Sequence, residues 1–309
     1  MQALRDRVSV VIPAYHAGPF IGRAVRSVME QTWEAQEIVI VADDGTDYRR
    51  LLAESDRSDS RVRCLSTGGV GTGPANARNA GLDAAQGRVV ATLDADDMLE
   101  PTALETLVPL ALEHGAACCR PGFIDQVTGA ELQSFDRPLP SGPVALEELL
   151  TSHLHTYAGI VFDRNQVTAR WPEWGELWED VYFHVRCFDD LDALYHVNEP
   201  LYRYYRVPGS LCNRAETGRE HLLSAGRLAG RLLNGDTLGL RKAASRELFR
   251  RYLQSRQAIE MVYLQALADG SCRDFHAFMG NNLDLFYTLD VAGDSGQGSS
   301  RLEALPPVG

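Results

Sequence analysis

The sequence predicts an α/β protein with a mostly parallel sheet flanked by helices, followed by a C-terminal helical region. Over the first hundred residues, short apolar runs alternate with amphipathic stretches, which is typical of strand–helix–strand units. From about residue 216, leucines and aromatic residues recur at helical spacing and indicate long packed helices. With 309 residues, 45% of them hydrophobic, the chain can bury a large core. We predict a first domain over 1–215, a helical region over 216–292 and a disordered Gly/Ser/Pro-rich tail over 293–309.

Strands and helices alternate in the predicted first domain. Residues 8–12 are mostly β-branched and apolar, so we expect a buried strand that Pro13 ends. By the same patterns, further strands are predicted at 37–41, 62–65 and 89–93, with helices at 19–31, 46–53, 75–85 and 101–114. Beyond residue 115, the pattern predicts strands at 116–119, 159–162 and 193–197, and a helix from Glu179.

Charge and composition exclude several classes of function. Thirty Lys and Arg against 42 Asp and Glu give a net charge of −12, which is the wrong sign for binding nucleic acid or anionic lipid. The only lysine is Lys242, so a P-loop lysine and a Schiff-base lysine are not expected. No apolar run approaches the roughly 20 residues of a membrane span. With six scattered cysteines and no leader pattern, we expect a cytoplasmic protein with reduced thiols.

Acidic residues gather in two loops that follow predicted strands. The first loop carries Asp43 and Asp44, and the second carries Asp94, Asp96 and Asp97. In an open parallel sheet, ligands bind outside the carboxyl ends of the strands. Carboxylates brought together there repel one another unless a cation lies among them, and oxygen ligands suit Mg²⁺ or Mn²⁺. The alternative for the first loop is helix capping and turn formation, which aspartate also favours.

Six segments follow one another in a recognisable order. They are VVIPAY at 10–15, ADDGT at 42–46, NARNAGLDAAQG at 76–87, ATLDADD at 91–97, WED at 178–180 and PLYRYYRVPGSL at 200–211. Together they resemble the motif series of the family 2 glycosyltransferases with a GT-A fold, over roughly the first 210 residues. The resemblance implies inverting transfer of a sugar from a nucleoside diphosphate donor to an acceptor hydroxyl of a saccharide or small molecule. It also implies a Mn²⁺ or Mg²⁺ cofactor. Among the donors, UDP is favoured over GDP.

The resemblance also implies roles for residues that face the nucleotide. Pro13 and Tyr15 would lie at the nucleotide, with Tyr15 packed beside the nucleobase. Either Asp43 or Asp44 would accept a hydrogen bond from the base or the ribose. Arg78 would pair with donor phosphate, for which a guanidinium has a suitable forked geometry.

Two further motifs of the resemblance would bind the metal ion and the donor phosphates. Asp94 and Asp96 match the family's DxD, so Asp94 would face the ribose or metal-bound water and Asp96 would ligate the metal. Arg206 and Ser210 match a closing motif that approaches the donor phosphates. We expect this segment to be mobile without ligand and to fold over the donor, because Pro208 and Gly209 form a turn within it.

Asp180 matches the family's catalytic base. A helix that begins near Glu179 would favour a carboxylate at its N-terminus, so we expect Asp180 to be ionised at neutral pH with weak basicity. A helix-terminal charge pair is the alternative interpretation of Glu179 and Asp180. On the acceptor side, Glu179, Trp174 and Trp178 are candidates, and Trp171 could join the two tryptophans, since aromatic rings pack on sugar CH faces. Packing in the core explains the tryptophans equally well.

Two other functions compete with the transferase hypothesis. The first is a non-catalytic subunit that binds a nucleotide sugar or glycan on the same fold, against which the intact Asp96 and Asp180 argue. The second is a sugar-nucleotide pyrophosphorylase, which would need its glycine-rich loop after the first strand, whereas the glycines of 68–73 follow the third. We interpret 68–73 as a flexible turn. The C-terminal helices could also pair two copies of the chain.

Overall fold

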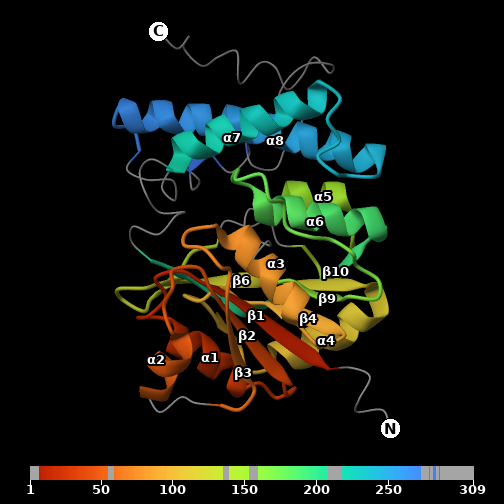
Figure 1. Cartoon of the computed structure of the whole chain (residues 1–309). Helices are drawn as coiled ribbons and strands as arrows, with labels where there is room; N and C mark the ends of the chain where they lie inside the picture. The colour runs from red at the N-terminus through yellow and green to blue at the C-terminus, as the bar shows by residue number, and fades with distance from the viewer. Residues whose placement is uncertain are drawn as a thin grey trace.

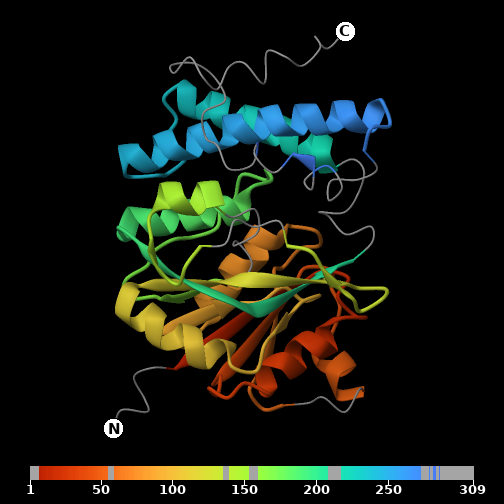
Figure 2. The same cartoon turned by 180° about the vertical axis from the view of Figure 1, so that it is seen from behind.

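The structure is a computed structural model that describes residues 7–54, 59–134, 139–152, 159–207 and 217–272, together with 278, 281, 282 and 285. A central sheet has helices on both faces, and a pair of long helices forms a further layer beyond one of them (Figure 1). The view from behind shows the same layers (Figure 2). No helix in these ranges has the length and apolar character needed to cross a bilayer.

The sheet confirms the predicted α/β class and its mostly parallel character. Its strand order is β3 (Val62–Ser66), β2 (Glu37–Ala42), β1 (Val8–Ala14), β4 (Val89–Thr92), β9 (Val161–Asp163), β6 (Ala116–Asp125), β10 (Leu194–Arg206) and β5 (Met98–Leu99). The first four strands pair in parallel, as do β6 and β10. Strand β9 lies antiparallel between β4 and β6. Two short strands pair at the margins, β7 (Glu131–Leu132) with β6 and β8 (Gly142–Val144) with β10.

Successive side chains of each strand point to opposite faces of the sheet and pack into two hydrophobic cores, one on each face. In β1, Val10 and Ile12 face the layer of α1 (Ile21–Met29), α2 (Tyr48–Glu54) and α4 (Ala103–His114). Val11 faces the layer of α3 (Pro74–Ala84), α5 (Leu146–Ser152) and α6 (Glu179–Asp190). The same core continues into α7 (Thr217–Leu233) and α8 (Ala243–Ala268), which confirms the predicted long C-terminal helices.

Some predicted boundaries are wrong. Strand β1 runs through Pro13 to Ala14, although we expected Pro13 to end it. The backbone groups of Val11 and Pro13 both point towards β4. The pairing of β1 with β4 ends at Val11, so β4 needs no hydrogen bond from the nitrogen of Pro13, which carries no hydrogen. Strands β6 and β10 extend well beyond their predicted ends, and our predictions include neither α5 nor the shortest strands. The predicted tail lies outside the described residues.

The close approach of α3 to β1 places the site. A Cβ on Gly81 would overlap the Val11 side chain, so only glycine lets the helix lie this near the strand. Arg78 lies about one turn earlier on α3. It is therefore held near the carboxyl end of β4, where the acidic loop of Asp94, Asp96 and Asp97 begins.

Candidate active site

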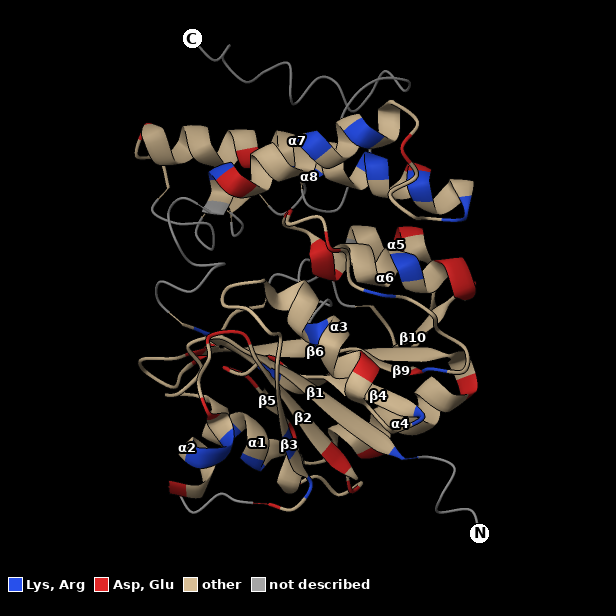
Figure 3. Ribbon diagram, in the orientation of Figure 1, with Lys and Arg blue, Asp and Glu red and all other residues tan. Residues whose placement is uncertain are grey.

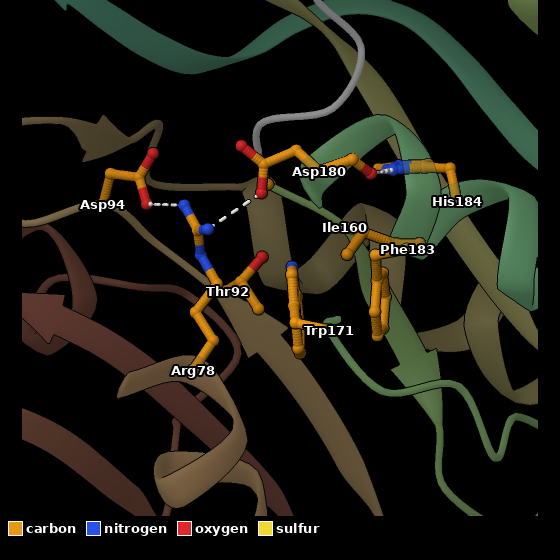
Figure 4. A pocket seen from close by; sticks show the side chains of 9 residues that line it. Arg78, Thr92, Asp94, Ile160, Trp171, Asp180, Phe183 and His184 are labelled. Atoms are coloured by element: carbon orange, nitrogen blue, oxygen red, sulfur yellow. Dashed lines mark hydrogen bonds and ion pairs between the residues drawn. The ribbon is translucent and has the colours of Figure 1, made fainter. Parts of the chain in front are cut away.

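Arg78 is the centre of a cluster of carboxylates. Arg78 is 6% exposed, and its guanidinium has Nη2 2.8 Å from Asp94 Oδ1 and Nη1 2.9 Å from Asp180 Oδ1 (Figure 4). Glu179 Oε1 lies 4.0 Å from Nη1. Burial alone would lower the pKa of Arg78, but the charges of these three carboxylates outweigh it and raise the pKa. One buried cation therefore joins the loop after β4 to the first turn of α6.

Asp180 lies in the first turn of α6, as predicted, but its charge is not held as expected. Burial raises the pKa of Asp180 to about 7, Arg78 opposes the rise, and the charges of Glu179 and Asp94 add to it. Its side chain is 37% exposed and lines a pocket. The prediction of weak basicity is wrong, because burial outweighs the favourable helix terminus. A carboxylate with a pKa near 7 can accept a proton at neutral pH.

The pocket has a charged wall and an apolar wall. Its lining residues are Arg78, Thr92, Asp94, Gly159, Ile160, Trp171, Asp180, Phe183 and His184 (Figure 4). Trp171 stacks on Phe183 with ring centroids 3.7 Å apart, and the Arg78 guanidinium lies 5.9 Å from the Trp171 ring. His184 Nδ1 lies 3.0 Å from the backbone oxygen of Asp180, and burial lowers the pKa of His184 to about 4, so the ring is neutral. None of the six motifs includes Trp171 or His184 as a site residue.

The third aspartate of the acidic loop ties this loop to β10. Tyr202 Oη donates to Asp97 Oδ2 at 2.7 Å, and the Tyr205 backbone N–H donates to Asp97 Oδ1 at 2.8 Å. The Asp94 backbone N–H donates to Tyr202 Oη at 3.2 Å. Burial, with the charges of Asp96 and Asp94, raises the pKa of Asp97 well above its usual range. Asp97 thus has a structural task that the sequence did not reveal.

Asp96 is the aspartate of this loop that suits a metal ion. Asp94 is paired with Arg78 and Asp97 with the two tyrosines, whereas the Asp96 carboxylate accepts no hydrogen bond from another described residue. Burial and the charge of Asp94 raise the pKa of Asp96 to about 6, so a cation beside it would relieve an unfavourable charge. Within the described ranges, no three His, Cys, Asp or Glu side chains converge as a metal site. A Mg²⁺ or Mn²⁺ ion on Asp96 stays a prediction.

Arg23 is an additional residue at the acidic loop. Its guanidinium donates through Nη2 to the Asp96 backbone oxygen and lies 3.6 Å from the centroid of the Tyr205 ring. Burial lowers the pKa of Arg23, while Tyr205, Asp97 and Asp96 act in the opposite direction. Arg23 stands in α1 outside every motif, so no sequence signal pointed to it.

Asp43 organises the glycine-rich segment 68–73. Its carboxylate is buried and accepts hydrogen bonds from Thr67 Oγ1 at 2.7 Å, Thr72 Oγ1 at 2.6 Å and the Gly73 N–H at 2.9 Å. These bonds outweigh burial and lower the pKa of Asp43. The segment that we interpreted as a flexible turn is therefore tied down. A contact of Asp43 with the nucleobase stays a prediction.

The turn interpretation describes Asp44 well. Its side chain is 1% exposed and accepts hydrogen bonds from the backbone N–H groups of Thr46 at 2.9 Å and His16 at 2.7 Å. Tyr48 Oη donates to the same carboxylate at 2.9 Å. With its oxygens occupied by the chain itself, Asp44 supports the loop on which Tyr15 stands.

Tyr15 presents an exposed aromatic ring close to the loop of Asp43 and Asp44. It is 53% exposed, follows β1 and its Pro13, and lies 4.2 Å from the His16 ring. Arg206 ends β10 beside Asp125, and its contact with donor phosphate stays a prediction, as does that of Arg78. Ser210 and the 208–209 turn lie outside the described residues.

The two tryptophans pack against helices, as our alternative interpretation has it. Trp174 makes an edge contact with Tyr182 at 4.4 Å, and Trp178 one with Tyr252 at 5.9 Å. Trp178 also lies 4.9 Å from the His221 ring. Glu179 belongs to the Arg78 cluster. Acceptor contacts of these three residues stay predictions.

Comparison with known proteins identifies the class. Residues 9–166 match the model of glycosyl transferase family 2, and the chain belongs to this family. It is 37% identical over 132 residues to the uncharacterized glycosyltransferase YibD of Escherichia coli K12, covering 42% of this chain and 38% of that protein. It is 28% identical over 218 residues to the uncharacterized glycosyltransferase alr2836 of Nostoc, covering 66% of each. The chain thus spans less than two thirds of either relative.

A third relative and a solved structure have more specific names. The chain is 36% identical over 107 residues to Escherichia coli WfgD, a UDP-Glc:alpha-D-GlcNAc-diphosphoundecaprenol beta-1,3-glucosyltransferase, covering 35% of this chain and 42% of WfgD. The structure of S. aureus TarS residues 1–349 superposes with a TM-score of 0.60 at 18% identity, covering 91% of this chain and 80% of that one. The predicted family and GT-A fold are thereby confirmed.

Proposed function

We propose that this protein transfers a sugar, with inversion, from a nucleoside diphosphate sugar to an acceptor hydroxyl, and that Asp180 is the general base. The observation that carries the proposal is the Arg78 cluster. It brings the loop of Asp94 and Asp96 and the carboxylate of Asp180 to one pocket. A donor-binding loop and a base with a pKa near 7 are the two parts that such a transfer needs.

The reaction is a single displacement. The acceptor oxygen attacks the anomeric carbon, its proton passes to an oxygen of Asp180, and the bond to the diphosphate breaks with the electron pair leaving on the nucleoside diphosphate. Asp180 works from the side opposite the leaving group, which inverts the centre. Trp171 and Phe183 form an apolar wall beside the base and keep water away from it.

The leaving diphosphate needs positive charge. A divalent cation held by Asp96 would supply Lewis-acid stabilisation of the developing charge. Arg78 fixes the orientation of Asp94 next to it and opposes protonation of Asp180. The same guanidinium therefore sets the orientation of Asp94 and lowers the tendency of Asp180 to be protonated.

A uridine nucleotide is the favoured donor. The relative WfgD is named for UDP-glucose, and TarS has been crystallised with UDP-GlcNAc in a structure that superposes at a TM-score of 0.54 with 17% identity, covering 92% of this chain and 90% of that one. In this chain the exposed Tyr15 ring offers a face for a nucleobase. The cytoplasmic location and a pairing of copies through the C-terminal helices stay predictions.

Calorimetry with UDP and GDP, each with Mn²⁺ or with excess chelator, tests the donor side. We expect UDP with Mn²⁺ to bind at least tenfold more tightly than either UDP with chelator or GDP with Mn²⁺. Asp96→Asn should bind UDP equally weakly with and without Mn²⁺, and Glu105→Gln, an acid on α4 outside the site, is the control. Equal affinity of the wild type with and without Mn²⁺ would contradict the metal role.

Asp180→Asn separates the transferase from a non-catalytic binding subunit. The variant keeps the size of the side chain, so donor binding should be unchanged, whereas transfer should fall by about a hundredfold or more because the general base is lost. A wild-type protein that binds the nucleotide and transfers no sugar to any acceptor of a saccharide panel would favour the binding subunit.

A further inference from the structure

We infer that α7 is part of the catalytic apparatus, because a row of its residues fixes the segment that presents Asp180. The inference rests on the proposed role of Asp180 as base. We call His221, Ser224, Arg227 and Arg231 the α7 row. Their spacing of three, three and four residues places them on one face of the helix. This face lies against 174–178, the segment that leads into α6.

The α7 row and the segment 174–178 run in opposite directions. The Arg231 guanidinium lies 5.7 Å from the Trp174 ring centroid. Arg227 forms a forked pair with Glu176, with Nε 2.6 Å from Oε1 and Nη2 2.5 Å from Oε2. These two contacts hold the beginning and the middle of the segment.

The end of the segment is held by backbone groups. Ser224 Oγ donates to the Leu177 backbone oxygen at 3.4 Å, and Trp178 Nε1–H donates to the His221 backbone oxygen at 3.2 Å. Four successive contacts thus pair residues 174, 176, 177 and 178 with 231, 227, 224 and 221. Such an ordered series fixes the register of the segment along the helix.

Trp178 shows what the α7 row holds in place. Its backbone has φ 75° and ψ 17°, the left-handed conformation that a bulky side chain rarely adopts. Trp178 is also the N-cap residue of α6, because its carbonyl oxygen accepts the first hydrogen bond of the helix, from the Tyr182 N–H at 2.9 Å. Asp180 follows two residues later. The direction in which α6 presents Asp180 therefore depends on a strained residue that α7 holds by its side chain.

The placement agrees with the overall arrangement. In Figure 3 the start of α6 is red and lies below the helix pair α7–α8, and α7 carries blue arginine bands. The Trp178 ring meets Tyr252 of α8 as well, so both C-terminal helices contact the entry to α6.

Point variants can test the α7 row without unfolding the protein. The Arg227 side chain is 56% exposed, and exposed ion pairs contribute little to stability. We expect Arg227→Ala and Trp178→Phe, which loses the indole N–H, to lower kcat about tenfold, since small displacements of a catalytic group are costly. KM for the donor and Kd for UDP with Mn²⁺ should stay within about twofold of the wild type.

A charge exchange distinguishes positioning from general damage. Glu176→Arg should lower kcat as Arg227→Ala does, and Glu176→Arg combined with Arg227→Glu should recover at least half of the lost activity. Arg250→Ala breaks the pair with Glu247 on α8 and is the matched control, with kcat unchanged. Wild-type kcat in Arg227→Ala, or no recovery in the exchanged pair, overturns the inference.

Amide hydrogen exchange tests the same inference without any activity. Arg227→Ala should accelerate exchange of the Tyr182 N–H, which bonds to Trp178, and leave the Leu191 N–H, which bonds to Cys187 at the other end of α6, unchanged. Unchanged protection of Tyr182 overturns the inference even if transfer is detected. If the wild type binds no nucleoside diphosphate and transfers no sugar, the proposed function fails instead, and the exchange result still stands.

Discussion

A guanidinium as deeply buried as that of Arg78 is tolerated only because carboxylates surround it. Asp94, Asp180 and Glu179 compensate its charge, and Arg78 in turn compensates theirs. Removing one member leaves the others without compensation, so the cluster acts as a unit. The residue that the motif predicts to be a phosphate ligand is thus also the residue that holds the site together before a donor binds.

Replacing Arg78 should destabilise the protein in a pH-dependent manner. Arg78→Ala leaves Asp180 and Glu179, whose pKa values are already raised, without their cation. The loss of unfolding free energy should reach about 3 kcal/mol at pH 8, above the pKa of about 7 of Asp180. It should shrink towards pH 5, because protonation removes the uncompensated charge. Urea titrations of both proteins at the two pH values measure this, and Arg164→Ala is the control, because this arginine directly follows β9 and donates to the backbone oxygens of Ala85 and Gly87.

The pKa of Asp180 sets the pH profile of transfer. Only the ionised carboxylate accepts a proton, and its pKa is raised from 3.8 to about 7. We therefore expect kcat/KM to fall about tenfold per pH unit below pH 7, with a midpoint near 7. Donor binding measured at the same pH values shows whether binding contributes. A midpoint near 4 would mean that Asp180 is a normal, solvated carboxylate or is not the base.

At the scale of elements, β10 holds the acidic loop in shape. Tyr202 and Tyr205 stand next to Asp97 because β10 pairs in parallel with β6 and antiparallel with β5, directly after the loop. The motif around 200–211 is thus partly structural: two of its tyrosines support the loop that carries Asp96. The strand also delivers Arg206 to the same edge of the sheet.

Tyr202→Phe tests this support. The change leaves Asp97 Oδ2 buried without the donor at 2.7 Å and removes the acceptor of the Asp94 N–H. We expect a loss of about 1–3 kcal/mol of unfolding free energy. UDP binding with Mn²⁺ should weaken more than UDP binding with chelator, because Asp96 moves with the loop. Tyr195→Phe on the same strand, where the ring stacks on His114, should change neither quantity.

Across the whole molecule, one hydrophobic core connects the sheet to the C-terminal helices. Val11 of β1, Phe183 of α6 and Phe249 of α8 belong to the same cluster. A division of the chain at residue 215 therefore cuts through a shared core, while the α7 row contacts the entry to α6. This arrangement explains why the helical region and the catalytic domain are expected to unfold together.

Phe249→Ala measures that coupling. Phe249 is fully buried and its ring lies 5.9 Å from that of Tyr182, so truncation should cost about 3–5 kcal/mol. We expect a single unfolding transition in the wild type, and a lower midpoint in the variant for both tryptophan fluorescence and far-ultraviolet circular dichroism. Two separate transitions, with only one shifted, would show that 216–292 is an independent domain.

Local signals in the sequence determined the fold class, most helices and strands, the family and the candidate loops. Periodicity of apolar residues reports on burial within one element, and contiguous motifs such as 91–97 and 178–180 report on one loop at a time, so the aspartates and the start of α6 at Glu179 were predictable. Strands as short as β5 were not, because two residues carry no period and form only by pairing with β10.

Only the tertiary structure decided how these parts act on one another. In the folded protein Asp97 bonds to Tyr202 of β10, and burial raises the pKa of Asp180 to about 7. Helix α7 contacts the segment 174–178 that leads into α6. Each of these depends on contacts between segments that lie between 43 and 105 residues apart in the chain. Burial and charge at a site are sums over such neighbours, and a neighbour exists only once the chain has folded.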